Sequence, residues 1–144
     1  MFKKTIIIFF VLISNFSFLY ADIITVDNKF PSVGQYKILQ KAHDAAKSGD
    51  IIYVYPSKEP YGDLVISKKM TITGSIMLET STVKTISLTG NSAGSIIDSL
   101  NVENIQINSE NNTIRNNSNI GSIYVNAENV IRNNSNIELY FHLY

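Results

Sequence analysis

The residues best suited to chemistry in this chain are one Asp and two Arg residues at regular spacing. Asp98 is followed by Arg115 and Arg132, each 17 residues further on. If the chain coils with this period, the three side chains form one exterior column, where paired charges can bind or act on an acidic sugar. The plainer interpretation, which we favour, is a solvent-exposed ion pair worth at most about 1 kcal/mol. The column also depends on Ile97 facing inward, because a register shifted by one residue turns every side chain to the other face.

Three tyrosines are the aromatic candidates for sugar contact. Tyr53, Tyr55 and Tyr61 lie close together in the sequence, and exposed aromatic rings stack on sugar rings. Tyr61 therefore joins Asp98, Arg115 and Arg132 as a weak candidate for binding. The alternative that we favour is that the tyrosines cover the seam between a helix and the first coil.

The sequence predicts no catalytic residue, no metal ion and no cofactor. Acid–base hydrolysis needs a pair of converging carboxylates, and the acidic residues after Asp63 are scattered. The chain has no Cys, and its two His residues, His43 and His142, have no second ligand at metal spacing. No Ser stands in a recognisable arrangement with His and Asp.

Short β-rich runs separated by Gly, Asn and Ser must position these side chains. One helix is expected at 35–48, with Ile38, Leu39, Ala42, Ala45 and Ala46 on its buried face and Gly49 ending it. From residue 51 onward only short strands follow. Their expected ranges are 51–55, 64–66, 70–73, 84–89, 95–97, 102–107, 113–115, 122–125, 130–132 and 138–143.

An internal repeat shows how the strands are arranged. TIRNNSNI at 113–120 returns as VIRNNSNI at 130–137. A period this short suits a solenoid and is too short for a helical repeat. We therefore predict an all-β, right-handed parallel β-helix with about 17–20 residues per coil and about five turns. The expected stacked pairs are Ile114 on Ile131, Asn116 on Asn133, Asn117 on Asn134, Asn119 on Asn136, and Ile120 on Ile137.

The alternative for the C-terminal region is a disordered polar tract, since 13 of the 16 Asn residues follow residue 100. That interpretation leaves the recurrence of Ile at fixed positions unexplained. Asn instead suits the sharp corners of a solenoid, because it tolerates left-handed backbone and forms side-chain ladders.

Residues 35–74 resemble the N-terminal entry of right-handed parallel β-helix proteins of the pectate-lyase-like superfamily. The matching residues are Ala45, Ala46, Gly49 and Asp50; Ile51 to Val54; Tyr61 and Gly62; and Ile66, Lys68, Thr71, Ile72 and Gly74. The resemblance implies a helix that caps the first coil. It is nearly silent on function, because the superfamily includes polysaccharide lyases, esterases, hydrolases, phage tail proteins and adhesins.

The N-terminal residues 1–21 are typical of a secretory signal peptide, with Lys3 and Lys4 before a short apolar run. We place the cleavage after Ala21; a membrane anchor is the less favoured alternative, because the run is short for a spanning helix. Residues 22–49 would then hold the first strand and the cap, and 50–144 the coils. The mature chain has 10 basic and 12 acidic residues, a net charge of about −2, which gives no support for a nucleic-acid or membrane partner.

These features predict an exported module in the periplasm, in the medium or on the cell surface. We expect it to be a non-catalytic protein for adhesion or contact with a polysaccharide or cell-surface glycan. The alternative is a remnant or minimal form of a polysaccharide-acting enzyme. The aromatic C-terminal residues indicate either a truncated member of a longer family or an end that folds back as a cap. An uncapped end with Leu139, Phe141 and Leu143 predicts self-association through the last coil or poor solubility.

Overall fold

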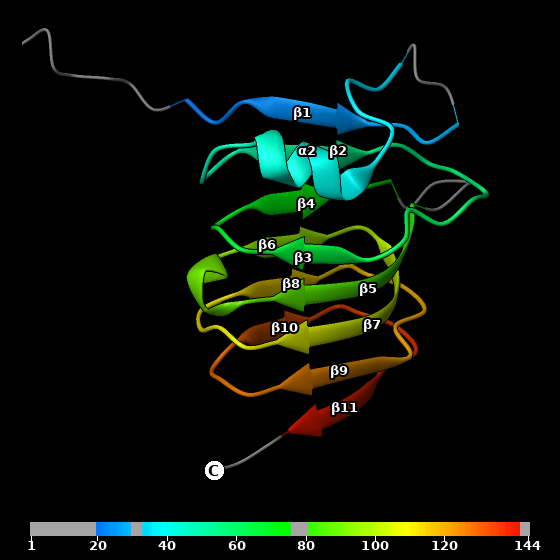
Figure 1. The fold of residues 1–144 in the computed structure, drawn as a ribbon. Coiled ribbons are helices and arrows are strands. Elements are labelled where there is room, and N and C mark those ends of the chain that lie inside the picture. The colour runs from blue at the N-terminus through cyan, green and yellow to red at the C-terminus, as the bar shows by residue number, and fades with distance from the viewer. Residues whose placement is uncertain (1–19, 30–32, 76–80, 142–144) are drawn as a thin grey trace, which may run out of the picture.

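Short strands pair in parallel with their equivalents one coil later and build a parallel β-solenoid of about five turns. The computed structural model describes residues 20–29, 33–75 and 81–141. Figure 1 shows the strands stacked along one axis, with β1 at one end and β11 at the other. The predicted all-β parallel solenoid with a single α-helix is confirmed.

Two parallel sheets form the main walls of the solenoid, and their strands run in opposite directions (Figure 1). The six-stranded sheet consists, in order, of β1 (Ile23–Val26), β2 (Ile51–Val54), β4 (Thr71–Thr73), β6 (Ile96–Asp98), β8 (Thr113–Arg115) and β10 (Val130–Arg132). The five-stranded sheet consists, in order, of β3 (Leu64–Ile66), β5 (Thr82–Leu88), β7 (Asn101–Ile107), β9 (Ser122–Val125) and β11 (Glu138–Phe141). A short 3-10 helix, η1 (Gly90–Ser92), lies between β5 and β6.

Stacked aliphatic columns fill the space between the sheets. One column runs through the registered residues Ile52, Ile72, Ile97, Ile114 and Ile131. The first four are fully buried, and burial of each such side chain stabilises the fold by about 1.5–3 kcal/mol. The period is 17 residues in the C-terminal coils but 25 between Ile72 and Ile97, so the early coils exceed the predicted length.

Left-handed backbone forms the corners of the later coils. Positive φ angles occur at Asn116, Asn119, Asn133 and Asn136, all between 50° and 54°. This conformation is costly for most L-residues and is tolerated by Asn, whose short side chain bonds locally. The Asn-rich composition of the C-terminal half therefore follows from the geometry of the turns.

The helix α2 (Leu39–Ala45) is shorter than the predicted 35–48. Residues 35 and 36 lie outside the helix instead, because they cover the open edge of β1. The Tyr36 amide donates to Thr25 O (3.0 Å), and the Gln35 side chain accepts from the Thr25 amide (2.8 Å). Gly49 has the expected positive φ of 96°, but it lies in the turn into β2 and does not end the helix.

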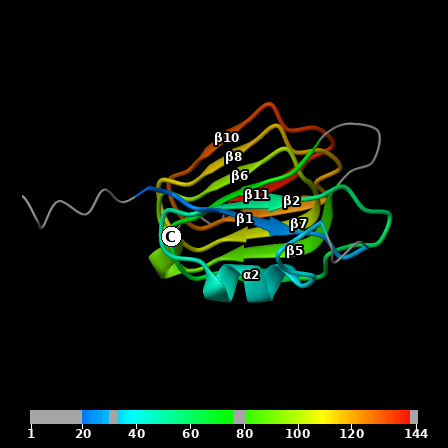
Figure 2. The ribbon, with the colours of Figure 1, turned by 90° about the horizontal axis from the view of Figure 1, so that it is seen from above.

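The buried face of α2 also differs from the prediction. Leu39, Ala42 and Ala46 are buried as expected, whereas Ile38 and Ala45 are exposed. His43 takes their place and is only 1 % exposed. Seen from above, α2 lies alongside the coil at the β1 end of the stack (Figure 2), where it contacts β1, β2 and β3.

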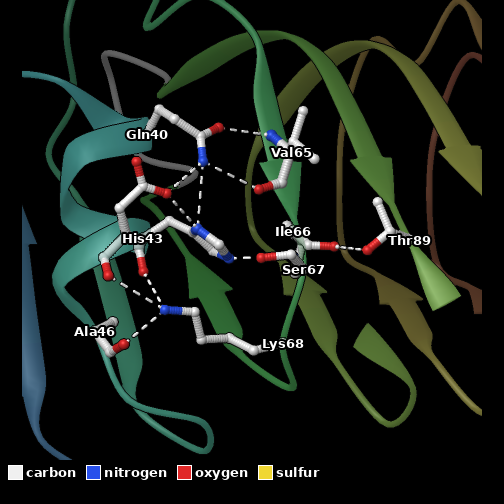
Figure 3. A network of polar contacts seen from close by, with 9 residues as sticks. Gln40, His43, Ala46, Val65, Ile66, Ser67, Lys68 and Thr89 are labelled. Carbon is white, nitrogen blue, oxygen red and sulfur yellow. Dashed lines mark hydrogen bonds and ion pairs between the residues drawn. The ribbon is translucent and has the colours of Figure 1, made fainter. Parts of the chain in front are cut away.

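Side chains of α2 act as a substitute strand for the edge of β3. The Val65 amide donates to Gln40 Oε1 (2.8 Å), and Gln40 Nε2 donates to Val65 O (3.2 Å) (Figure 3). The Ser67 amide donates to His43 Nε2 (3.2 Å). These bonds satisfy backbone groups that would otherwise template pairing with another chain.

Lys68 also joins the helix to the first coil, but here the side chain comes from the coil and bonds to the backbone of the helix. Its Nζ donates to the carbonyls of His43 (2.9 Å), Asp44 (3.3 Å) and Ala46 (2.7 Å) (Figure 3). These carbonyls lie at the C-terminal end of the helix, where a cation is favourable and the last carbonyls lack helical partners. The β1 end of the solenoid is therefore closed by specific hydrogen bonds.

Candidate functional site

The exterior column proposed from the sequence exists on the outward face of the six-stranded sheet. Asp98, Arg115 and Arg132 are registered partners in β6, β8 and β10. Asp98 Oδ2 accepts from Arg115 Nε at 2.9 Å and lies 2.8 Å from Nη2. Ile97 is fully buried, so the register is the one that places these charges outside.

Donors surround the Asp98 carboxylate. Its other oxygen, Oδ1, accepts from Asn116 Nδ2 (2.9 Å) and from Ser99 Oγ (3.0 Å). Partial burial raises the pKa of Asp98, but the hydrogen bonds from Asn116, Arg115 and Ser99 and the charge of Arg115 outweigh it. The net pKa is lowered. Asp98 is therefore an ionised acceptor that orients Arg115, with little capacity to give or take a proton at neutral pH.

Arg132 is the charged side chain on this face that is available to bind a ligand. It is exposed, and among the described residues it forms no ion pair. Arg115 lies beside it in the next strand, with its own charge offset by Asp98. Two guanidinium groups one coil apart repel each other unless an anion lies between them, so the pair is suited to an anionic group.

Hydroxyl, aromatic and aliphatic side chains continue the same face toward β1. Tyr53 and Thr73 precede Asp98 in the charged column. A second outward column, two residues away along each strand, contains Ile51, Thr71, Ile96, Thr113 and Val130. The result is a regular surface whose rows repeat at the strand spacing of about 4.8 Å.

A polar hollow of about 400 Å³ borders the charged column at the corner after the strands. It is lined by Ser99, Asn116, Asn117, Ser118, Asn133 and Ser135. Hydroxyl and amide groups can both donate and accept hydrogen bonds, as sugar hydroxyls do. The hollow therefore extends the charged column with the kind of groups that bind uncharged parts of a glycan.

Tyr61 is not part of this face, and the structure places it in the seam beside the first coil. The residue is only 8 % exposed, and its hydroxyl donates to Tyr55 O (2.8 Å). Burial raises the pKa of Tyr61 to about 12. The ring fills the space beside β1 and β2, so it cannot stack on a sugar. Tyr53 and Tyr55 are half-buried and pack edge to face, with ring centroids 5.1 Å apart.

The structure brings the predicted ladder residues together, with one difference in the side chains. Asn134 Oδ1 accepts from the Asn117 amide (2.9 Å) and from Asn117 Nδ2 (3.1 Å). Asn136 Nδ2 donates to Asn119 Oδ1 (3.0 Å). Asn116 and Asn133 share the same corner conformation, but the Asn116 amide group donates to Asp98.

A second, buried ladder was missed from the sequence. Asn112 is fully buried; its Oδ1 accepts from the Ser95 amide (3.0 Å), and its Nδ2 donates to Asn129 Oδ1 (3.0 Å). Ser92 and Ser109 are hydrogen-bonded one coil apart at the same side of the solenoid. The signal was the 17-residue spacing of Ser92 and Ser109, and of Ser95, Asn112 and Asn129, which lies outside the repeated octapeptide.

The described residues contain few side chains suited to acid–base catalysis or metal binding. No cluster of three or more metal-ligating side chains occurs in residues 20–29, 33–75 and 81–141. His43 is buried and accepts from the Ser67 amide, so its role is structural. His142 and most of the expected signal peptide lie outside the described residues. No helix in the described part of the chain is both long and apolar enough to cross a membrane.

Comparisons of this chain with family models, with curated proteins and with solved structures find no match. The structure itself defines the class as a parallel β-solenoid, with Asn ladders in its interior and a charged outward face.

Proposed function

We propose that this protein is an exported, non-catalytic β-solenoid module that binds acidic glycans on the outward face of its six-stranded sheet. Within the pectate-lyase-like superfamily that residues 35–74 resemble, it would belong with the surface and adhesion proteins. The observation that carries the proposal is the exposed Arg132 beside the Asp98–Arg115 pair. A carboxylated sugar placed between Arg115 and Arg132 would relieve the repulsion between them.

The non-catalytic assignment is supported by the environment of Asp98. Both of its oxygens accept hydrogen bonds, and its pKa is lowered. A general acid needs a raised pKa, and a general base needs a free lone pair directed at the substrate. The remnant-enzyme alternative needs a second carboxylate on this face, and the charged column offers only Arg115 and Arg132 beside Asp98 in the later coils.

The proposal is tested by binding of the purified protein to polygalacturonate and alginate, with a neutral glucan for comparison. We expect salt-sensitive binding to the two acidic polymers, weakened at least tenfold by Arg132→Ala and by Arg115→Ala. Lys58→Ala removes an exposed charge from a loop near the other end and is the control. Equal binding to the neutral glucan, or no effect of either Arg variant, would refute the proposal. Cleavage of a polymer that depends on Asp98 would favour the enzyme.

A further inference from the structure

The two ends of the solenoid are treated very differently. At the β1 end, residues 35–36 and α2 cover the edges of β1 and β3. At the β10–β11 end, Leu139 and Phe141 are 45 % and 63 % exposed. They belong to the same inward-facing columns as Ile123 and Val125, which are buried one coil earlier. An open hollow of about 450 Å³ lies beside Phe141 and Ile131. The described residues thus present an uncovered core and two strand edges together.

The backbone groups that face this open end can be assigned from the bonds to the preceding coil. The Val130 amide donates to Asn112 O, and Arg132 O accepts from the Asn116 amide. In a parallel ladder successive residues direct their backbone groups to opposite edges, so the N–H and C=O of Ile131 face outward from the end. In β11 the Glu138 amide donates to Gly121 O, so the N–H and C=O of Leu139 face the same way.

The side chains on these two edges are complementary to each other when one strand is reversed. In β10, Val130 and Arg132 face the surface and Ile131 faces the core. In β11, Glu138 and Tyr140 belong to the outward columns of Ser122 and Tyr124, and Leu139 to the inward column of Ile123. Antiparallel pairing of β10 with β11 of a second copy, with Ile131 opposite Leu139, sets Arg132 opposite Glu138 and Val130 opposite Tyr140.

That single register satisfies every requirement of an antiparallel pair at once. Ile131 and Leu139 can exchange both of their free backbone hydrogen bonds. Inward residues meet inward residues, so the aliphatic columns of the two copies become continuous. Opposite charges stand across from each other on the outer face, and so do two apolar side chains, each a favourable cross-strand pair.

The geometry of a spiral selects the same pairing. Because β11 follows β10 by about half a turn, the two edges differ in height by about half of the 4.8 Å strand spacing. If β10 met β10 and β11 met β11, one pair would be too far apart to bond when the other was in contact. A two-fold axis parallel to the strands pairs the higher edge with the lower edge on both sides. It also makes the two contacts identical, as an isologous dimer requires.

We propose that the chain forms a two-fold dimer through this end, with β10 of each copy hydrogen-bonded antiparallel to β11 of the other. The occupant of the open end is therefore a second copy of the same chain. Arg132 takes part in both this proposal and the glycan proposal. Glu138 lies on the other sheet, so Glu138→Arg changes the dimer contact and leaves the Arg115–Arg132 column intact, which separates the two tests.

Charge reversal tests the pairing in the full chain, purified after export. We expect a concentration-dependent dimer in sedimentation equilibrium. Glu138→Arg alone or Arg132→Glu alone should weaken it at least tenfold, and the double variant should restore it. Glu59→Arg, at an exposed position in the loop between β2 and β3, is the control. A wild type that stays monomeric at high concentration, or that grows into open-ended assemblies, overturns the proposal. So does a double variant that dimerises no better than the single ones.

A cross-link tests the register directly, since the chain has no Cys of its own. Val130 and Tyr140 of the second copy would form a non-hydrogen-bonded pair with Cα atoms about 4.5 Å apart, a separation that a disulfide spans. The variant with both Val130→Cys and Tyr140→Cys should oxidise to a covalent dimer, whereas either single variant should not. Circular dichroism of the reduced variants shows whether the fold is kept. Efficient cross-linking of Val130→Cys alone would mean that β10 meets β10, which the proposal excludes.

Discussion

Ile114 and Arg115 are consecutive in the chain but lie on opposite sides of one strand. Ile114 is fully buried between Ile97 and Ile131, whereas Arg115 forms an ion pair at the surface. Ile114→Asp would bury a carboxylate without a partner, and we expect it to prevent folding. Arg115→Ala should cost only about 1 kcal/mol, because the half-buried Asp98 keeps its bonds from Asn116 and Ser99. Urea unfolding monitored by circular dichroism measures both, and a folded Ile114→Asp protein would contradict the column assignment.

Asn117 is expected to be a stronger contributor to stability than its polarity indicates. Its Oδ1 accepts from the Leu100 amide (3.0 Å), and its Nδ2 donates to Ile97 O (3.0 Å), both within the buried region. Asn117→Ala leaves the Leu100 amide without an acceptor, at a cost of about 1–3 kcal/mol, and removes the side-chain donor to Ile97 O, which keeps its place in the ladder with β8. Asn126→Ala is the control, because Asn126 is exposed and its side chain bonds only to Asn108 at the surface. Equal effects of the two substitutions on the free energy of unfolding would show that the ladder is not a stabilising element.

The lowered pKa of Asp98 predicts how its contribution to stability depends on pH. The folded protein favours the ionised carboxylate, so the contribution is complete above the unfolded pKa of about 3.9 and is lost as the pH falls through the lower folded value. We expect the wild type to be more stable than Asp98→Asn at neutral pH and to lose this advantage below about pH 4. Urea unfolding across this pH range measures the difference, which would be constant if the ion pair did not form.

At the level of elements, the strands were readable from the sequence and the helix was only partly so. Within the described residues, every predicted strand from residue 51 onward is present, with bounds that differ by at most two residues. Positions 142–143 of the last predicted strand lie outside the described residues. Strand positions follow from the local alternation of apolar and polar residues and from the 17-residue period of the repeated octapeptide. The helix depends on non-local contacts: Gln35 and Tyr36 are drawn into pairing with β1, and this shortens it.

The residues of the candidate site that share a strand register could be predicted from the sequence. Residues whose position depends on tertiary packing could not. Once Ile97 was assigned to the interior, Asp98, Arg115 and Arg132 had to share an outer column. Tyr61 could not be placed this way, because its burial results from contact with the carbonyls of Val26 and Tyr55 across a loop. The burial of His43 was equally hidden, since its acceptor role depends on the edge of β3 lying beside the helix.

The capping role of α2 gives a prediction at the same scale. Gln40→Ala removes both bonds to the edge of Val65, and we expect a loss of about 1 kcal/mol in the free energy of unfolding. The Val65 amide should also exchange its hydrogen faster. Lys41→Ala, at an exposed position on the same helix, is the control and should leave both quantities nearly unchanged. Unaltered exchange at Val65 in the Gln40 variant would show that the side chain does not protect the edge.

As a whole molecule, the protein is a stack in which each coil contacts the coils before and after it. In the described part of the chain, strands contact mainly their neighbours within a sheet, and α2 contacts mainly β1, β2 and β3. Stability in such an architecture is approximately a sum of coil and interface terms. The two ends then differ in kind. One is held by α2 and Lys68, whereas the described residues of the other are held by strand pairing and Asn ladder bonds to the preceding coil.

The even spacing of the last coils sets how the molecule should respond to force. Residues Ile97, Ile114 and Ile131 follow one another at 17-residue intervals, with the same ladder bonds repeated at each interval. A monomer stretched between its termini in an optical trap should therefore peel from the β11 side, one coil at a time. Each step in these last coils should release about 17 residues and lengthen the tether by about 60 Å. The coil held by α2 should rupture last and at the highest force. A single rupture of the entire chain would instead show that its coils unfold as one cooperative unit.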